Sequence, residues 1–174
     1  MSLTHRLATL DDIPAIKQLM RASMEGLLPD VLTPVQVKNS YATMGLDTGL
    51  IKDGTYFLVF SDGALAGCGG WSRRRTLYGG DHMVARDDSL ADPHTEPAKT
   101  RAMYTHPDFT RRGIGSLILS LGEDAARAEG FKAMELGATA SGILLYEKRG
   151  YKPMEDIPED DGVSVPNTRM RKLL

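Results

Sequence analysis

The spacing of apolar residues near the start of the chain predicts a helix. Ile13, Ile16 and Met20 follow one another at intervals of three and four residues, which is the period of one helix face. Thr9 stands before them with an acidic residue three positions later, a pattern typical of a helix-capping box. We therefore expect a helix over about 10–25.

The next segments predict a second helix and a β-hairpin. A capping pattern begins at Thr33, where proline takes the first helical position, and predicts a helix that ends near 44–45. Residues 55–60 are an unbroken run of β-branched and aromatic side chains, as in a short buried strand. Asp62-Gly63 is a strong hairpin signal, so residues 65–71 are expected to return antiparallel to that strand.

Three glycines interrupt the returning strand, at positions 67, 69 and 70. A glycine inside a strand marks a β-bulge or the close approach of another group, such as a ligand. Close packing of the strand beneath a helix explains the glycines equally well. Both explanations stay open at this point.

The segment 74–98 shows no convincing period and predicts a long loop, which in a compact domain is usually functional or disordered. Clearer elements follow. In order they are a strand over 99–105, a helix from Ile114 that ends at Gly130, a strand over 132–136, a short helix over 141–149 and a weaker strand over 163–170.

This order of elements predicts an α/β fold. The strand–helix–strand unit over 99–136 requires parallel strands, whereas the hairpin before it is antiparallel. A mixed sheet with helices on its faces follows. We expect it to form one domain over 1–174, with 74–98 as a long loop insertion.

The composition is that of an ordinary folded protein. The chain has 174 residues, of which 41% are hydrophobic and 25% charged. A net charge of -2 gives no general attraction to nucleic acid or to an anionic membrane. Cys68 is the only cysteine, which excludes an intrachain disulfide and a zinc site built on paired cysteines. We see no secretory signal and no apolar run of about 20 residues, so we expect a cytoplasmic protein.

The clearest chemical signal is Gly113-Ile114-Gly115 at the start of the third predicted helix. Glycines there allow close approach of the backbone, and the first helical turn offers free N–H groups to an anion such as pyrophosphate. Arg111 and Arg112 add positive charge. The P-loop and the GxGxxG dinucleotide fingerprint are both absent. A Gly-x-Gly pair also serves simple close packing, so the motif alone does not decide.

A second segment makes the motif specific. Ser141–Tyr151 places a tyrosine on a short helix, four residues before its closing glycine. Together with His106-Pro107 and Thr110–Gly115, it resembles the GNAT (Gcn5-related N-acetyltransferase) superfamily. The order of elements agrees over nearly the whole chain, least securely over 74–98 and 155–162.

The resemblance implies a fold and an activity. The fold is that of the acyl-CoA N-acyltransferases, with about six or seven strands, helices on both faces and a central parallel pair that splays to admit pantetheine. The activity is transfer of an acetyl group from acetyl-CoA to a primary amine, by direct attack in a ternary complex. Acetyl-CoA is then a co-substrate, and no metal is expected. Proteins that resemble this one are often homodimers.

The resemblance also assigns a binding loop. The family motif Gln/Arg-x-x-Gly-x-Gly/Ala falls on Thr110–Gly115, with Thr110 as a departure at its first position. Backbone amides cradle the anion, so this departure is not expected to disable the site. The residues that would hold the CoA pyrophosphate are Arg111, Arg112, Gly113, Ile114, Gly115 and Ser116.

Further positions follow from the same comparison. Met103 and Thr105 fall where the central strand of the family pairs its backbone with the pantetheine arm. The backbone N–H of Met103 or Tyr104 would stabilise the oxyanion that develops on the thioester carbonyl. Ser141 stands where the family often has an asparagine, a second departure that would weaken a contact with pantetheine.

Tyr146 falls on the usual general-acid tyrosine of the family, next to the CoA sulfur. A phenol with a pKa near 10 is protonated at pH 7, but full transfer of its proton to a thiolate with a pKa near 8.5 is uphill by about 2 kcal/mol. Stabilising the thiolate through a hydrogen bond is the safer role. The alternative is a tyrosine at the edge of the core with a solvated hydroxyl.

The general base stays open in the sequence. The attacking amine must be neutral, so a base is expected, often acting through water. No spacing selects one residue, and His82, His94 and Glu96 match no standard metal-ligand set. The candidates by residue type are Glu25, Asp81, His82, His94 and Glu96.

The acceptor is equally open: a polyamine, an amino acid, an antibiotic, or a protein N-terminus or lysine. Tyr78 and Trp71 are candidates for one wall of its pocket, although Trp71 fits the core equally well. Five acids over 155–161 would attract a cationic amine or form a solvated loop. Arg73–Arg75 would meet an anion such as the CoA 3′-phosphate or end a strand in solvent. His106, before proline, is interpreted as structural.

One rival keeps the fold without catalysis, as an acyl-CoA-binding sensor or interaction module. A binding module has no need of a donor beside the sulfur, so Tyr146 favours the enzyme. Binding of a phosphopeptide or nucleic acid is weaker still and would show a steep dependence on salt.

Overall fold

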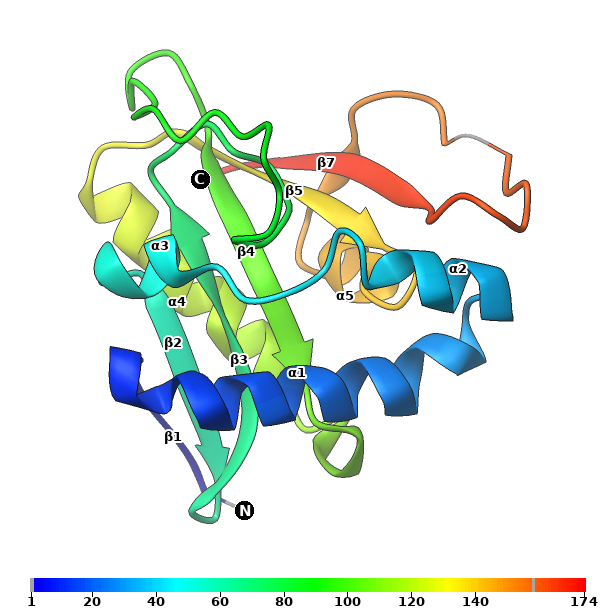
Figure 1. Ribbon diagram of the computed structural model, residues 1–174. Helices are drawn as coiled ribbons and strands as arrows, with labels where there is room; N and C mark the ends of the chain where they lie inside the picture. The colour runs from blue at the N-terminus through cyan, green and yellow to red at the C-terminus, as the bar shows by residue number, and fades with distance from the viewer. Residues whose placement is uncertain (1, 158) are drawn as a thin grey trace.

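Seven strands form one mixed sheet in the computed structural model, which describes residues 2–157 and 159–174 (Figure 1). Their order across the sheet is β1-β2-β3-β4-β5-β7-β6, and only the β4–β5 pair is parallel. This confirms the predicted fold class. The strands are β1 (Leu3–Leu7), β2 (Tyr56–Ser61), β3 (Ala64–Ser72), β4 (Ala98–Thr105), β5 (Ala133–Thr139), β6 (Lys152–Pro153) and β7 (Asn167–Leu173).

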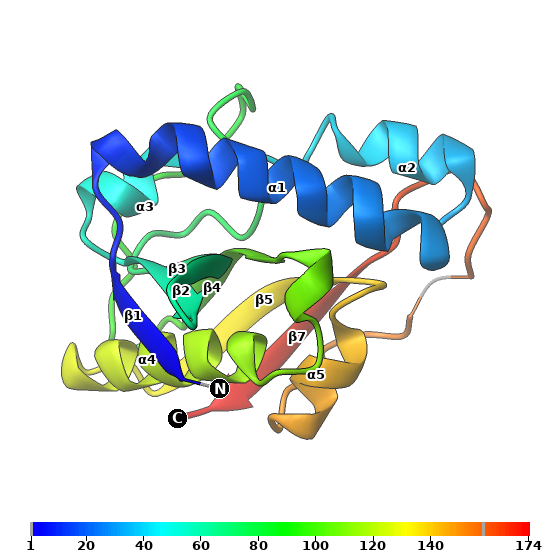
Figure 2. The same cartoon turned by 90° about the horizontal axis from the view of Figure 1, so that it is seen from below.

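Helices cover both faces of the sheet, as Figure 2 shows. One face carries α1 (Ile13–Leu27), α2 (Pro34–Ser40) and α3 (Thr48–Lys52). The other carries α4 (Ile114–Ala128) and α5 (Ile143–Lys148). Apolar side chains of α1 and of α4 pack on opposite sides of β2–β5, so the sheet separates two cores.

The predicted helix starts are present, but the second helix ends early. Thr33 and Gln36 form the expected capping box, with the Gln36 N–H donating to Thr33 Oγ1 over 3.3 Å. The helix ends at Ser40 rather than near 44–45. The chain then continues in a tighter turn, in which the Ala42 and Thr43 N–H groups donate to the carbonyls of Asn39 and Ser40, three residues earlier. The following segment is then free to cross toward β4.

Three short elements were not predicted. They are β1, α3 and β6, and each has five residues or fewer. The last predicted strand was also misplaced, because β7 covers Asn167–Leu173 instead of 163–170. Only the first residue of β1 is half-buried and the others are exposed, so this edge strand carries no alternating apolar pattern.

The central parallel pair splays, as predicted. β4 and β5 are paired only at Ala98 with Met134 and at Lys99 with Glu135. Beyond these positions β5 continues against β7, whereas β4 continues against β3. The two strands therefore separate toward their carboxyl ends and leave an opening in the middle of the sheet (Figure 1).

The loop over 74–98 has a fixed course, held by ion pairs. The basic run before and within it does not end free in solvent: Arg73 pairs with Glu129, Arg74 with Asp53 and Arg75 with Glu96, each at 2.7 Å. A backbone bridge between Arg74 and Leu90 closes the base of the loop. Near its start, the carbonyls of Thr76 and Gly79 accept hydrogen bonds from Arg101 of β4.

The pair between Arg75 and Glu96 is expected to make stability depend on pH. The Arg75 guanidinium holds the pKa of Glu96 at about 2, below the usual 4.5. Because this pKa is lowered on folding, the contribution is present above about pH 4.5 and is lost as the pH falls toward 2. Glu96→Gln should therefore lower the Tm slightly at pH 7 and leave it unchanged at pH 2, as measured by circular dichroism. An equal shift at both pH values would contradict this assignment.

Candidate active site

A β-bulge lies in β4 at the point where the sheet opens. Cys68 is opposite Tyr104 and Gly70 is opposite Arg101, so β4 has one residue more than β3 over this stretch. The extra residue is accommodated at Ala102, whose φ of 49° lies in the left-handed region.

Two of the strand glycines are explained by close contacts. A Cβ on Gly69 would lie 2.7 Å from Met103 Cγ, directly at the bulge. A Cβ on Gly67 would collide with Ile114 of α4. Both sequence explanations therefore apply, the bulge at Gly69 and packing beneath a helix at Gly67.

The bulge directs the backbone N–H of Met103 into the opening. Successive residues of a strand turn their N–H groups to opposite edges. The His106 N–H donates to the carbonyl of Ala66 on β3 over 2.9 Å, and Tyr104, two residues earlier, is paired with Cys68 of β3. Met103 therefore directs its N–H away from β3, toward the gap between β4 and β5.

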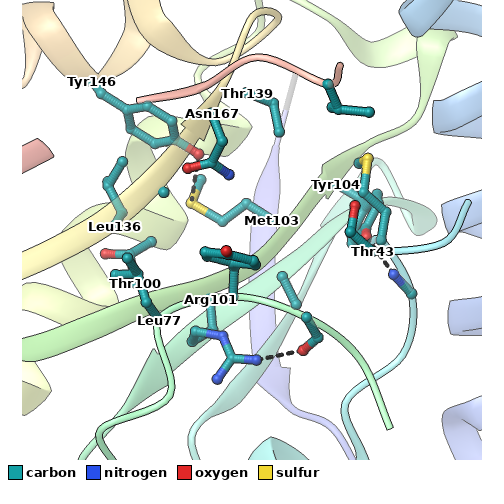
Figure 3. Close-up of a pocket in the computed structure, with 17 residues that line it drawn as sticks. Thr43, Leu77, Thr100, Arg101, Met103, Tyr104, Leu136, Thr139, Tyr146 and Asn167 are labelled. Atoms are coloured by element: carbon teal, nitrogen blue, oxygen red, sulfur yellow. Dashed lines mark hydrogen bonds between the residues drawn. The ribbon is translucent and has the colours of Figure 1, made fainter. Parts of the chain in front are cut away.

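A cavity of ≈ 220 Å³ lies at this opening (Figure 3). It extends from the split between the strands to the segment after α2 and the long loop. The backbone and side chains around it come from six parts of the chain: Thr43–Gly45, Leu77–Gly79, Thr100–Tyr104, Leu136, Gly137 and Thr139 of β5, Tyr146 of α5, and Val165 with Asn167 near β7.

Tyr146 is buried at the wall of this cavity, and its hydroxyl points toward Met103 and Asn167 (Figure 3). The hydroxyl lies 3.9 Å from Met103 Sδ. Its ring packs edge-on against Tyr151, with the centroids 6.0 Å apart. A Cβ on Gly142 would lie 2.6 Å from the Tyr146 ring, so that glycine lets the ring lie flat on its own helix. Burial raises the pKa of Tyr146 to about 12.

The loop before α4 has the geometry of an anion site. Arg111 and Gly113 both have positive φ, at 62° and 81°, and Gly113 is the N-cap of α4. Left-handed residues alternating with others turn successive N–H groups to one side, and such concave loops bind anions. Arg111, Arg112 and Gly113 are exposed. Gly115 has another role, since a Cβ there would lie 2.6 Å from Leu145 of α5.

Of the proposed backbone contacts in β4, Met103 and Tyr104 both line the cavity. The Tyr104 side chain is buried on the α1 face, where its hydroxyl accepts from the Gly45 N–H over 3.1 Å. Thr105, the end of β4, and Ser141, before α5, are not among the residues that line the cavity. Ser141 is exposed, with its hydroxyl 3.3 Å from that of Thr139.

None of the five candidate bases is among the lining residues of the cavity. Two have other partners: Asp81 accepts from the Thr48 N–H, and Glu96 binds Arg75. His82 Nε2 lies 2.6 Å from the carbonyl of Ala42. Glu25 and His94 are exposed. Within the described residues, no three His, Cys, Asp or Glu side chains gather in a way that could hold a metal ion.

A buried charge network was missed in the sequence. Arg101 of β4 is 3% exposed and forms an ion pair with Asp47 at 2.9 Å. It also donates to the carbonyls of Gly79 and Thr76, at 2.6 and 3.2 Å, and so fixes the loop that walls the cavity. Arg86 of the same loop reaches Asp47 at 3.1 Å. An arginine inside an otherwise buried strand is the signal that could have found it.

The structure also gives the positions of the other residues singled out in the sequence. Trp71 does not wall the cavity, because it is buried in the core beside Phe131, at 6.1 Å between ring centroids. Tyr78 does line the cavity and is half-exposed. His106 is structural as expected, since its Nδ1 accepts from the Asp108 N–H in the turn after β4. In the acidic segment, Asp160 accepts from Gln36 Nε2 over 2.6 Å and so docks that loop on α2.

A sheet opened between two parallel strands, with a buried phenol at the split and exposed arginines before α4, is compatible with a long phosphorylated co-substrate. The model of the acetyltransferase (GNAT) family matches residues 16–151. The chain belongs to this family and is an acetyl-CoA-dependent N-acetyltransferase.

Solved structures agree on the fold. A GCN5-related N-acetyltransferase from Rhodopseudomonas palustris is 19% identical, with a TM-score of 0.69 over 100% of this chain and 97% of its own. The PaiA N-acetyltransferase from Thermoplasma acidophilum, solved with coenzyme A, is 16% identical, with a TM-score of 0.66 and all of both chains covered. YncA, a putative acetyltransferase from Salmonella typhimurium solved with acetyl-CoA, is 19% identical, with a TM-score of 0.64 over 99% and 94%.

No curated protein matches the sequence. Over residues 2–157 and 159–174, none of the helices is both long enough and apolar enough to cross a membrane.

Proposed function

We propose that the protein binds acetyl-CoA with the pantetheine arm between β4 and β5, and transfers the acetyl group to a primary amine at the cavity. The observation that carries the proposal is the opening itself: two strands that share only two paired positions, with Tyr146 at the wall of the gap. An extended amide-containing arm can bind the free backbone groups that the missing strand pairing leaves.

In this proposal Met103 supplies the oxyanion donor. The amine nitrogen attacks the thioester carbon, a C–N bond forms, and the carbonyl electrons move to oxygen. The Met103 N–H, which faces the gap, stabilises that oxygen. When the carbonyl re-forms, the C–S bond breaks and its electron pair leaves on sulfur. The products are the amide and, after the ammonium proton is lost, the free thiol of coenzyme A.

Tyr146 is proposed to donate a hydrogen bond to the leaving sulfur. Burial raises the pKa of Tyr146 to about 12, so losing its proton completely is unfavourable and carries a cost in this environment. A hydrogen bond to the thiolate avoids that cost. The thiolate then takes its proton from solvent or receives the proton that the attacking nitrogen loses.

The CoA diphosphate is assigned to the residues from Arg111 to Ser116. This segment carries the exposed guanidinium groups of Arg111 and Arg112 and the first N–H groups of α4. Because α4 has 15 residues and begins here, the positive end of its dipole also lies at this segment. Arg112 is partly ordered already, because its guanidinium lies 5.2 Å from the centre of the Phe109 ring.

The acceptor is assigned to the far side of the cavity, between Thr43–Gly45 and Leu77–Gly79. The long loop over 74–98 then has a function, because its residues Leu77–Gly79 supply one wall of the acceptor pocket. Arg101 is the one charged residue among those lining the cavity. The amine must reach the site in its neutral form.

The direct test is release of coenzyme A thiol from acetyl-CoA over a panel of amines: polyamines, amino acids, aminoglycosides and peptides with a free N-terminus or lysine. We expect turnover with at least one class and binding of CoA by calorimetry. A well-folded protein that binds neither CoA nor acetyl-CoA would overturn the proposal.

Arg112→Ala is expected to raise the KM for acetyl-CoA about 5- to 30-fold, because a hydrogen bond to a charged group contributes about 1–2 kcal/mol at a partly exposed site. The KM for S-acetylpantetheine, which has no diphosphate, should not change. Lys132→Ala, on an exposed residue away from the cavity, is the control. A parallel rise for both acyl donors would place Arg112 elsewhere in the site.

A further inference from the structure

Tyr56 of β2 reaches across β3 to the bulge in β4. Its hydroxyl donates to the carbonyl of Ala102 over 2.8 Å and lies 3.2 Å from Cys68 Sγ. Tyr56 is opposite Gly70 in the β2–β3 register, where a Cβ would collide with the backbone of Thr55 and Tyr56. The residue is 1% exposed and packs in the core beneath α1.

The carbonyl that Tyr56 binds belongs to the same peptide unit as the Met103 N–H. A trans peptide is planar, and its C=O and N–H point in opposite directions. A donor that holds the Ala102 oxygen toward the α1 side therefore holds the Met103 hydrogen toward the other side, where Tyr146 lines the gap. One hydrogen bond fixes the direction of both groups.

This peptide unit needs such a support. Ala102 has a φ of 49°, in the left-handed region that is unfavourable for a residue with a Cβ. The bulge also removes the regular ladder partners that would otherwise hold the unit in place. Burial raises the pKa of both Tyr56 and Cys68, to about 12 for the thiol, so both groups stay protonated in the working range.

We propose that Tyr56 is a positioning residue for catalysis, whose hydroxyl aims the Met103 N–H at the thioester oxygen by holding the opposite end of the same peptide unit. The inference rests on the proposed function, because it assumes that the thioester lies in the gap. Tyr56 does not contact the substrate in this arrangement. It acts through the backbone from two strands away.

Tyr56→Phe is the test, since it removes one hydroxyl and keeps the ring in the core. We expect kcat to fall by about 10-fold or more, toward the 10²- to 10³-fold loss that follows removal of an oxyanion donor. The Kd of CoA should change less than about twofold, because the diphosphate loop and the gap are intact. Tyr151→Phe is the control: it also removes a buried hydroxyl, bonded to Glu123 over 3.1 Å, but outside this peptide unit.

A spectroscopic measurement reports directly whether the Met103 N–H donates a hydrogen bond to the thioester oxygen. The infrared carbonyl band of acetyl-CoA labelled with ¹³C at the thioester should shift to lower frequency on binding to the wild type. In Tyr56→Phe the band should return toward its position in solution, and in Tyr151→Phe it should not. A purely structural role for Tyr56 would lower stability without moving this band.

A background substitution protects the test from loss of folding. Ala102→Gly relieves the left-handed strain and is expected to make the chain more stable. The Tyr56 hydroxyl is then removed in this background, and Ala102→Gly/Tyr56→Phe is compared with Ala102→Gly alone. The fall in kcat should be the same in this pair. Equal kcat and an equal carbonyl band with and without the hydroxyl would overturn the role of Tyr56 and leave the proposed function standing. Acetyl-CoA that binds the wild type with no shift of the band would overturn Met103 as the donor, and the inference with it.

Discussion

Replacing Tyr146 with phenylalanine is expected to lower kcat about 10²-fold, while the Kd of CoA changes by less than about threefold. A positioned donor beside a leaving group typically contributes 10²- to 10⁴-fold to the rate. The low end applies here because the pKa of about 12 makes Tyr146 a hydrogen-bond donor and a weak acid. For the same reason, ionisation of Tyr146 should not affect the pH profile of kcat below about pH 11. Steady-state kinetics and calorimetry test the two quantities separately.

Tyr151→Phe is the matched control for this experiment too, since Tyr151 is the buried ring against which Tyr146 packs. Its kcat should stay within a few-fold of the wild type. Unchanged turnover in Tyr146→Phe would remove Tyr146 from the mechanism and return it to the edge of the core. CoA binding with no turnover on any amine would instead favour the non-catalytic sensor.

Asp47→Asn is expected to lower the free energy of unfolding by about 3–5 kcal/mol, the typical cost of leaving a buried charge without its partner. Asp47 is 3% exposed and binds both Arg101 and Arg86. Asparagine keeps the N-cap of α3, where Asp47 Oδ1 accepts from the Gly49 N–H over 3.0 Å, so the substitution isolates the charge. Urea denaturation at pH 7 measures the effect.

Asp53→Asn provides the comparison for Asp47. It breaks another pair between a carboxylate and an arginine of the same loop, but the Arg74 side chain is 36% exposed. Exposed pairs contribute about 0–1 kcal/mol. Similar losses for the two variants would mean that the buried network contributes no more than a surface ion pair.

The long elements were predictable because their signals are local. Apolar spacing defines α1 and α4. The Gly113–Gly115 motif and the segment around Tyr146 are each short contiguous patterns. The five-residue helix α3 had no such signal, since it has a single capping residue and less than two turns. The edge strands β1 and β6 were not predicted either, because they are short and have no alternating apolar pattern.

The missed parts of the site depend on contacts between distant segments. Arg101 and Asp47 are 54 positions apart in the chain, and Tyr56 meets Ala102 across 46. Asn167 enters the cavity because β7 pairs along the whole of β5. No local sequence pattern predicts these contacts between distant segments. Conversely, Trp71 was a reasonable candidate for a wall of the acceptor pocket by residue type. The packing of α4 against β3 places it in the core instead.

The short parallel pairing between β4 and β5 also has a consequence for the empty protein. A gap in the middle of a sheet leaves two strand edges with free amide groups, and exposed edges are templates on which other chains add strands. Here those edges line the cavity between β4 and β5, and the coenzyme arm would cover them. The empty enzyme should thus be the form most prone to aggregate, with acetyl-CoA protecting its solubility as well as serving as a reactant.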